Sequence, residues 1–244
     1  MTSKEEKIIS KGVEISVIIP AFNEEKLIKN TITEVKTFLK DNFTKFEIIV
    51  VDDSSTDNTL AVLEGLDNIR VLKNLRNHGK GYTVAKGMKA ASGDWLLFMD
   101  ADNSTKITEL KKFLPHRDKY DLLIASRGLL DSDVQIKQNF IKSFFGRIGN
   151  IFSRLLIDKD IKDTQCGFKL ISKDAKYLFE KLTIAGFAFD FELIFLAKKY
   201  KFKTKEIAVT WVNNFDSTVK WYDYPKTMLN LILIHINNLL GKYN

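Results

Sequence analysis

The sequence Trp95-Leu96-Leu97-Phe98-Met99-Asp100-Ala101-Asp102 places five apolar residues directly before two carboxylates. Such a run, bounded by Gly93 and a charged turn, is typical of a buried strand. Successive side chains of a strand point to opposite faces, so Asp100 and Asp102 are expected on the same side. Ligands of open α/β folds bind at this end of the strands. Two hard oxygen ligands suit Mg²⁺ or Mn²⁺, although an isolated D-x-D can also be a solvated acidic turn.

The segments around this stretch alternate between strand and helix patterns. Apolar runs at 15–19, 46–51 and 69–72 indicate further strands, and the segments 24–40 and 78–91 are typical of helices. This alternation predicts an α/β fold, with a mostly parallel central sheet and helices on both faces. The carboxyl ends of parallel strands meet at one edge, so the polar residues that follow these strands are expected to lie together.

Length and composition indicate one large domain. The chain has 244 residues, of which 45% are hydrophobic, enough for a sizeable core. We expect a disordered lead-in over 1–12, one domain over 13–220 and a helical extension over 221–244. The single Cys166 excludes an internal disulfide and a thiolate-rich metal site, so nothing requires an oxidising compartment. The net charge of +7 favours polyanionic partners but does not choose among them.

Two nucleotide-binding motifs are absent. Gly79-Lys80-Gly81 begins like a dinucleotide fingerprint, but Val84 stands where the third glycine is required, and the segment is not in the first βα unit. No G-x-x-x-x-G-K-[ST] motif occurs either. The sequence therefore disfavours an NAD-binding Rossmann domain and a P-loop enzyme.

Several motifs occur together in a characteristic order. The segments 17–25 (VIIPAFNEE), 50–59 (VVDDSSTDNT), 77–81 (NHGKG) and 100–102 (DAD) resemble the ordered signature of glycosyltransferase family 2. In the second half, 125–127 (ASR), 163–169 (DTQCGFK) and 189–192 (FDFE) are similar to the branch that glycosylates polyprenyl phosphates. Within it, the likeness is to dolichyl-phosphate β-glucosyltransferases, with the mannosyltransferases as cousins. The Q-x-x-R-W motif of processive polysaccharide synthases is absent.

The resemblance implies a GT-A fold, a nucleotide-sugar donor, a divalent metal and inversion at the anomeric carbon. It implies UDP-glucose as donor, with GDP-mannose as the alternative, and no nucleic acid partner. Asp100 and Asp102 would hold Mg²⁺ or Mn²⁺ and carry the catalysis. Other readings stay open, since Asn23 and Asp57 could be helix caps and Lys80 a solvated lysine. By motif position, the nucleotide-sugar site would comprise Pro20, Ala21, Asn23, Glu24, Asp52, Asp53, Lys80 and Asp100.

The acceptor decides whether a base is needed. A lipid phosphate has a second pKa near ~6 and needs cationic anchoring rather than deprotonation. The segment 140–157 has an apolar helical face and a polar stripe with two arginines, although this could be an ordinary amphipathic helix. A saccharide hydroxyl acceptor would instead require a base, for which Asp190 is the candidate. The predicted lipid-phosphate site comprises Arg127, Ser143, Arg147 and Gln165.

The same reasoning gives a location. We expect peripheral association with the cytoplasmic face of a membrane, through the basic charge and the Phe-rich segment 140–157. The apolar run 228–240 is too short to span a bilayer and could lie in the interface, form a homodimer or cover the sheet. The three histidines lack zinc-site spacing and are read as structural. A third class of function is an inactive module that binds nucleotides or membranes.

Overall fold

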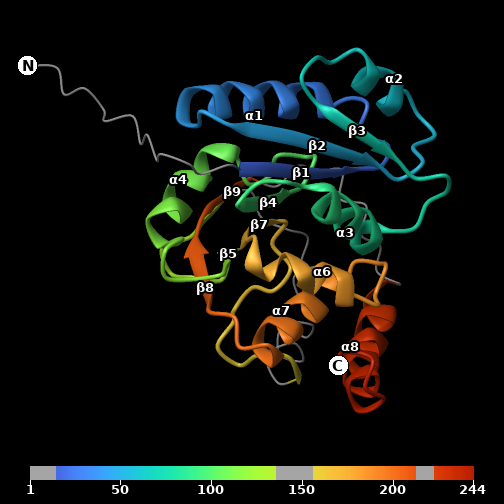
Figure 1. Cartoon of the computed structure of the whole chain (residues 1–244), viewed down its shortest axis with the longest axis vertical. Coiled ribbons are helices and arrows are strands. Elements are labelled where there is room, and N and C mark those ends of the chain that lie inside the picture. Colours follow the sequence, from blue (N-terminus) through green and yellow to red (C-terminus); the bar gives the residue numbers. More distant parts are fainter. Residues whose placement is uncertain (1–14, 136–155, 213–222) are drawn as a thin grey trace, which may run out of the picture.

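The computed structural model describes residues 15–135, 156–212 and 223–244, and its centre is a seven-stranded sheet (Figure 1). The strand order is β3-β2-β1-β4-β7-β5-β8, and two short strands form a separate pair, β6-β9. The strands are β1 (Ile15–Ala21), β2 (Phe46–Asp52), β3 (Arg70–Lys73), β4 (Trp95–Met99), β5 (Leu122–Ser126), β6 (Asp133–Gln135), β7 (Phe168–Ser172), β8 (Thr204–Ala208) and β9 (Thr210–Val212).

The large sheet is parallel except at one strand. β1, β2, β3 and β4 run parallel to one another, β7 lies antiparallel between β4 and β5, and β8 runs parallel to β5. Only β7 therefore reverses direction in this sheet, which confirms the predicted mostly parallel arrangement. The carboxyl ends of β1, β2 and β4 consequently lie at the same edge of adjacent strands.

Helices cover both faces of the sheet, as the sequence pattern predicted. α1 and the short helices after β4 pack on one face, while α3, α6 and α7 lie on the other, with α8 packed on α7 (Figure 1). Alternate strand residues divide between the two layers, because Leu97 and Met99 face α1 whereas Leu96 and Phe98 face α3. The helices are α1 (Ile28–Asn42), α2 (Thr59–Glu64), α3 (Lys80–Ala90), α4 (Leu110–Phe113), α6 (Leu178–Lys181), α7 (Phe189–Lys199) and α8 (Asp223–Leu239), with 3₁₀ turns at Ile107–Glu109, Leu114–His116 and Asp174–Tyr177.

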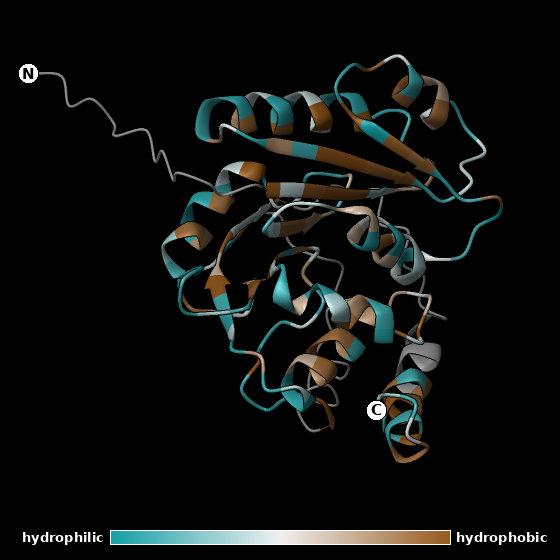
Figure 2. Ribbon diagram, in the orientation of Figure 1, coloured by the Kyte–Doolittle hydropathy of each residue, from teal (hydrophilic) through white to brown (hydrophobic). Residues whose placement is uncertain are grey.

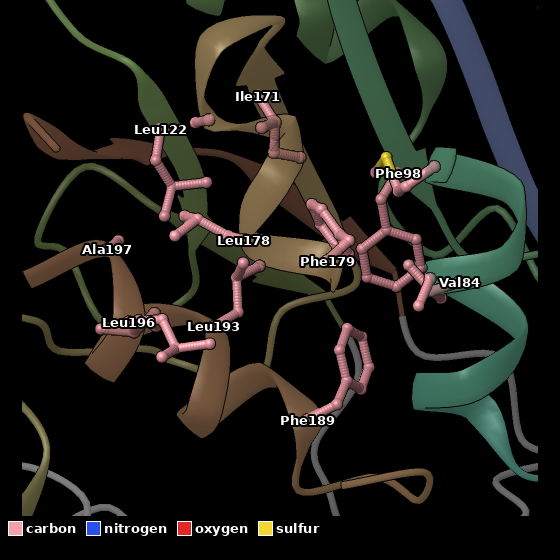
Figure 3. Packing of buried hydrophobic residues seen from close by; sticks show 14 of the residues in the cluster. Val84, Phe98, Leu122, Ile171, Leu178, Phe179, Phe189, Leu193, Leu196 and Ala197 are labelled. Atoms are coloured by element: carbon pink, nitrogen blue, oxygen red, sulfur yellow. The ribbon is translucent and has the colours of Figure 1, made fainter. Parts of the chain in front are cut away.

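In the layer that contains α3 and α7, aromatic side chains pack beneath the C-terminal end of β4. Phe98 from β4 meets Phe189 from α7 edge-on, with ring centroids 5.8 Å apart (Figure 3). Val84 of α3 lies beside them in the same buried cluster. This packing fixes the start of α7 against the end of β4, where the two carboxylates follow.

The first helix begins later than the sequence predicted. The segment 24–40 was expected to be helical, but α1 begins at Ile28, and the Glu24 carbonyl accepts the N–H groups of Leu27 and Ile28 in a turn. Asn23 does not cap this helix and has a positive φ of 57°. Asp57 accepts the N–H of Thr59, the first residue of α2, at 2.9 Å, so it serves this helix start from one position upstream of the cap.

The last helix packs on α7 and leaves an apolar face outward (Figure 2). Leu231 and Ile234 are buried, and beyond the helix the Tyr243 hydroxyl donates a hydrogen bond to the buried Glu192. None of the helices in the described ranges is long and apolar enough to cross a membrane. The predicted domain limits stay a prediction, and the lead-in over 1–12 lies outside the described residues. The exposed apolar residues of α8 and of the position after it are Leu229, Ile232, Leu233, Ile236, Leu239 and Leu240.

Candidate active site

The loops after β1 and β2 are joined by side-chain hydrogen bonds. Asn23 donates its N–H to Ser55 Oγ at 3.0 Å and accepts the N–H of Thr56 on its Oδ1 at 2.8 Å. The Ala21 carbonyl at the end of β1 accepts the Asp53 N–H at 2.9 Å. The structure thus brings together the 20–24 and 52–59 segments, which the family resemblance assigned to the nucleoside.

Asp52 and Asp53 have different partners. Asp53 is buried and accepts hydrogen bonds from Asn74 Nδ2 at 2.6 Å and from the His78 and Gly79 N–H groups at 3.0 and 2.8 Å. Asp52, also buried, accepts the Ser55 N–H at 3.3 Å on both oxygens. Asp53 therefore holds the start of α3, a positioning role that the sequence did not reveal.

Lys80, the first residue of α3, points at the acidic motif. Its Nζ lies 2.7 Å from Asp100 Oδ1, and its side chain is only 20% exposed. Burial alone would lower the pKa of Lys80, but the charges of Asp100 and Asp190 raise it above its usual value. The alternative that Lys80 is a solvated helix lysine is therefore wrong.

A glycine closes the other side of Asp100. The Asp100 N–H donates to the Gly167 carbonyl at 3.0 Å, which continues the β4–β7 pairing by one residue. A Cβ on Gly167 would lie only 1.9 Å from Asp100 Oδ2. The Asp100 carboxylate is therefore held between the Lys80 ammonium and the bare Gly167 backbone, and the DTQCGFK motif contributes a wall of the site.

Asp102 lies in the turn that follows. Its Oδ1 accepts the Ser104 N–H at 2.9 Å, and burial together with the charge of Asp100 raises its pKa. Two carboxylates that repel one another this way gain from a cation between them. Across the residues that the structure describes, no cluster of three His, Cys, Asp or Glu side chains could hold a metal. The two carboxylates Asp100 and Asp102 fit Mg²⁺ or Mn²⁺, because these ions are usually held by one or two carboxylates plus substrate phosphates.

Asp190 is paired and buried. It lies in the first turn of α7, is 3% exposed, and forms an ion pair with the fully buried Lys169 of β7. Lys169 Nζ also donates to the Cys166 carbonyl at 2.7 Å. Burial raises the pKa of Asp190, and the Lys169 charge opposes that shift. Lys169 belongs to the DTQCGFK motif. Its pairing with Asp190 joins residues 21 positions apart, so no local sequence pattern predicts it.

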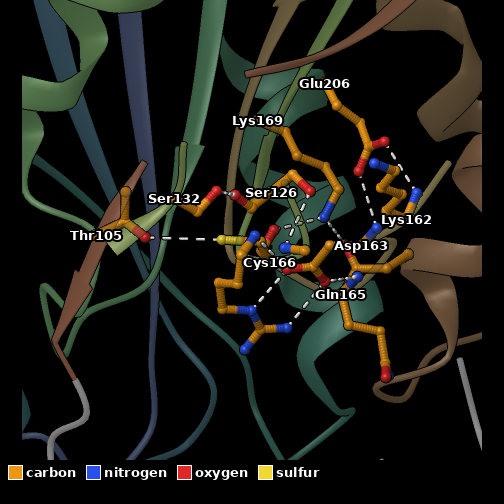
Figure 4. A network of polar contacts seen from close by, with 12 residues as sticks. Thr105, Ser126, Ser132, Lys162, Asp163, Gln165, Cys166, Lys169 and Glu206 are labelled. Carbon is orange, nitrogen blue, oxygen red and sulfur yellow. Dashed lines mark hydrogen bonds and ion pairs between the residues drawn. The ribbon is translucent and has the colours of Figure 1, made fainter. Parts of the chain in front are cut away.

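Arg127 is held by a second buried carboxylate. Asp163 accepts Arg127 Nε at 2.7 Å, Nη2 at 2.9 Å and the backbone N–H at 2.9 Å, and the Arg127 guanidinium lies 5.4 Å from the Trp211 ring centroid. Asp163 stands at the centre of a polar network beside Lys162 and Glu206 (Figure 4). The Gln165 side chain is exposed and extends away from this network (Figure 4). Burial would lower the Arg127 pKa, but Asp163 raises it above its usual range.

The remaining predictions about individual residues have separate outcomes. Ser143 and Arg147 lie outside the described residues, as does the polar stripe that contains them. The three histidines contact neighbouring groups: His78 stacks on Tyr82, His116 meets the Tyr120 ring edge-on, and His235 Nε2 lies 2.7 Å from the Leu156 carbonyl.

Comparison with known proteins agrees with this geometry. The family profile described as Glycosyl transferase family 2 matches residues 16–178. The chain is 34% identical to a dolichyl-phosphate β-glucosyltransferase of Drosophila melanogaster, over 96% of this chain and 78% of that protein. It is 35% identical to the enzyme of that name from Dictyostelium discoideum, over 94% of this chain and 76% of the relative.

A solved structure shares the fold. Glucosyl-3-phosphoglycerate synthase of Mycobacterium tuberculosis, solved with Mn²⁺ and UDP-glucose, superposes with a TM-score of 0.66. The match covers 95% of this chain and 79% of the other at 17% identity. The expected GT-A fold is confirmed, and the chain belongs to glycosyl transferase family 2.

Proposed function

We propose that the protein transfers glucose from UDP-glucose to dolichyl phosphate or another polyprenyl phosphate, with inversion at the anomeric carbon. The observation that carries this proposal is the identity of about a third, along nearly the whole chain, to proteins named for glucosyl transfer to dolichyl phosphate. The arrangement of Asp100, Asp102 and Lys80 at one edge of the sheet supports it independently.

The chain's own residues supply the environment for the leaving group. Asp100 and Asp102 would hold Mg²⁺ or Mn²⁺, which offsets the negative charge that develops on the departing nucleoside diphosphate. Lys80 lies beside Asp100 and offers a second positive charge to the same diphosphate. Asp53 holds the His78 and Gly79 N–H groups and so keeps Lys80 in place.

The burial of Asp190 favours a phosphate acceptor over a hydroxyl acceptor. A general base must reach the proton that it removes, at about 2.6–3.2 Å or through one water. Asp190 is 3% exposed and forms an ion pair with Lys169. Its carboxylate is therefore neither accessible to an acceptor hydroxyl nor free to accept the proton. A lipid phosphate, largely dianionic at neutral pH, attacks without such a base.

Arg127 is the described cation that best fits the acceptor phosphate. Asp163 occupies the Nε and Nη2 edge of the guanidinium and fixes its orientation, while Trp211 packs near its face. The Arg127 side chain is partly exposed at 29%, and Arg suits phosphate oxygens because it presents several donors in a plane. Ser143 and Arg147 remain proposed partners of the same phosphate, whereas Gln165 would have to turn its exposed side chain toward Arg127 to join them.

A matrix of donors and acceptors tests the proposal. Radiolabelled UDP-glucose and GDP-mannose are each incubated with Mn²⁺ and either dolichyl phosphate or 3-phosphoglycerate, and the product is partitioned into organic solvent. We expect organic-phase label only from UDP-glucose with dolichyl phosphate, and none with Asp102→Ala. Label from GDP-mannose would overturn the donor, and water-soluble product from 3-phosphoglycerate would overturn the lipid acceptor.

A lipid acceptor also requires access to a membrane surface, and α8 is the element that fits one. Its exposed apolar residues recur at helical spacing on one face. Two lysines contact its C-terminal end: Lys181 Nζ donates to the Asn244 carbonyl and Lys199 Nζ to Asn238 Oδ1. An exposed apolar helix face with basic side chains near one end matches an anionic leaflet.

Vesicle sedimentation tests this surface. The wild-type protein is expected to sediment with phosphatidylserine vesicles and to be released by high salt, whereas Leu233→Asp/Ile236→Asp should stay in solution. Unchanged sedimentation of the double variant would contradict the assignment. Loss of a dimer in light scattering, with vesicle binding unchanged, would show instead that a second copy covers the face.

A further inference from the structure

We infer that Lys80 is a built-in counter-cation for Asp100, and that a divalent metal displaces it toward the donor diphosphate, so that metal and nucleotide bind as a coupled pair. The inference rests on the proposed metal and nucleotide site. It adds that a metal ion alone competes with Lys80 for Asp100, whereas a metal ion that binds together with a diphosphate does not.

The geometry around Asp100 creates the competition. Oδ1 is in contact with Lys80 Nζ at 2.7 Å, and Oδ2 lies against Gly167, where even a methyl group would overlap it at 1.9 Å. A cation therefore approaches Asp100 from the side on which the ammonium lies. Because two like charges in a partly buried site repel strongly, metal and ammonium exclude one another there.

The local charges show why a diphosphate removes the conflict. Asp100, Asp102 and Asp190 exceed Lys80 and Lys169 by one negative charge. A divalent ion on its own reverses this balance to a net positive charge. A nucleoside diphosphate sugar that arrives with the metal brings about two negative charges and restores it, with Lys80 as its partner.

Lys80 has a long side chain with other groups near its ammonium. It lies at the first position of α3 on a flexible four-carbon stem, and its Nζ lies 5.4 Å from the Phe98 ring centroid and 6.0 Å from that of Phe187. Aromatic faces attract an ammonium over a range of positions, so Asp100 is not the only group that stabilises the Lys80 charge. Asp53 accepts the Gly79 N–H and so holds the backbone from which the Lys80 side chain extends.

Mn²⁺ binding measured without turnover tests the inference. Free Mn²⁺ is followed by electron paramagnetic resonance during titration of the wild type, Lys80→Met and Lys89→Met, each with and without UDP. Lys89 is an exposed lysine of the same helix, so its variant is matched in charge and fold position. For Lys80→Met we expect about tenfold tighter binding of Mn²⁺ alone, together with a smaller enhancement by UDP.

The outcomes separate this inference from the proposed function. If Lys80→Met binds Mn²⁺ without UDP no more tightly than the wild type and Lys89→Met do, Lys80 is not a counter-cation for Asp100 and the inference is overturned. A wild type that binds no Mn²⁺ even with UDP would instead overturn the proposed metal site. If Lys80→Met does not fold, as judged by circular dichroism, Lys80→Gln provides the same comparison.

Discussion

Replacement of Gly167 by alanine perturbs Asp100 without removing any charge or ligand. The new Cβ would lie 1.9 Å from Asp100 Oδ2 and 2.2 Å from its Cγ, whereas real Cβ contacts are longer than about 3.0 Å. The carboxylate must therefore move by about 1 Å. A misplacement of that size costs about 10²-fold in rate, or about 2.7 kcal/mol of transition-state stabilisation.

The fold should survive this change. Gly167 does not have a positive φ, so alanine is compatible with its backbone, and the overlapping atoms belong to a side chain that can rotate. We expect a loss of stability at the low end of the about 1–3 kcal/mol typical of overpacking. The assay is kcat for glucosyl transfer at saturating donor and Mn²⁺, together with urea unfolding.

Gly186 provides the matched control. It lies in the loop that packs against the start of α3, and a Cβ there would meet no atom within 4 Å. Gly186→Ala should therefore retain wild-type kcat. If Gly167→Ala keeps kcat within about threefold of wild type while Asp102→Ala is inactive, the position of Asp100 is not critical and the reasoning fails.

Three further predictions concern charges. Asp102→Ala should abolish Mn²⁺-dependent turnover and Asp100→Ala should weaken it, because the leaving-group charge loses its stabilisation; full activity of Asp102→Ala in excess EDTA would refute this. Asp190→Asn should lower the free energy of unfolding, measured with urea, by about 3–5 kcal/mol, because it leaves the buried Lys169 without its ion pair. If Asp190 were instead the catalytic base, the variant would have normal stability and a rate loss of about 10²–10⁴. Burial and the hydrogen bond to Glu192 raise the pKa of Tyr243 to about 12 from 10.0, so the unfolded chain loses this proton first as pH rises. The resulting stability is present below pH 10 and is lost toward about pH 12; Tyr243→Phe should flatten this fall in unfolding curves, and an unchanged slope would contradict it.

The predicted sheet followed from local pattern. An apolar run such as 95–99 can be a strand only if both faces of its sheet are covered. The helical periodicity of the segments between the strands predicted the helices that cover them. The parallel order then placed the ends of β1, β2 and β4 at one edge, so the polar segments 20–24, 52–53 and 100–102 could be grouped from sequence. The helix start at Ile28 was missed because the turn before it depends on hydrogen bonds with the 54–59 loop.

Periodicity and residue type were enough to predict the α/β class, the sheet edge where the polar residues lie together and the acidic pair Asp100 and Asp102. Which charged side chains pair with one another could be seen only in the folded structure. Lys80 could have been solvated and Asp190 could have been a free base; instead Lys80 meets Asp100, and Asp190 is paired with Lys169. These pairs join residues about 20 positions apart, on different elements, and a buried charge takes whichever partner the packing brings within reach.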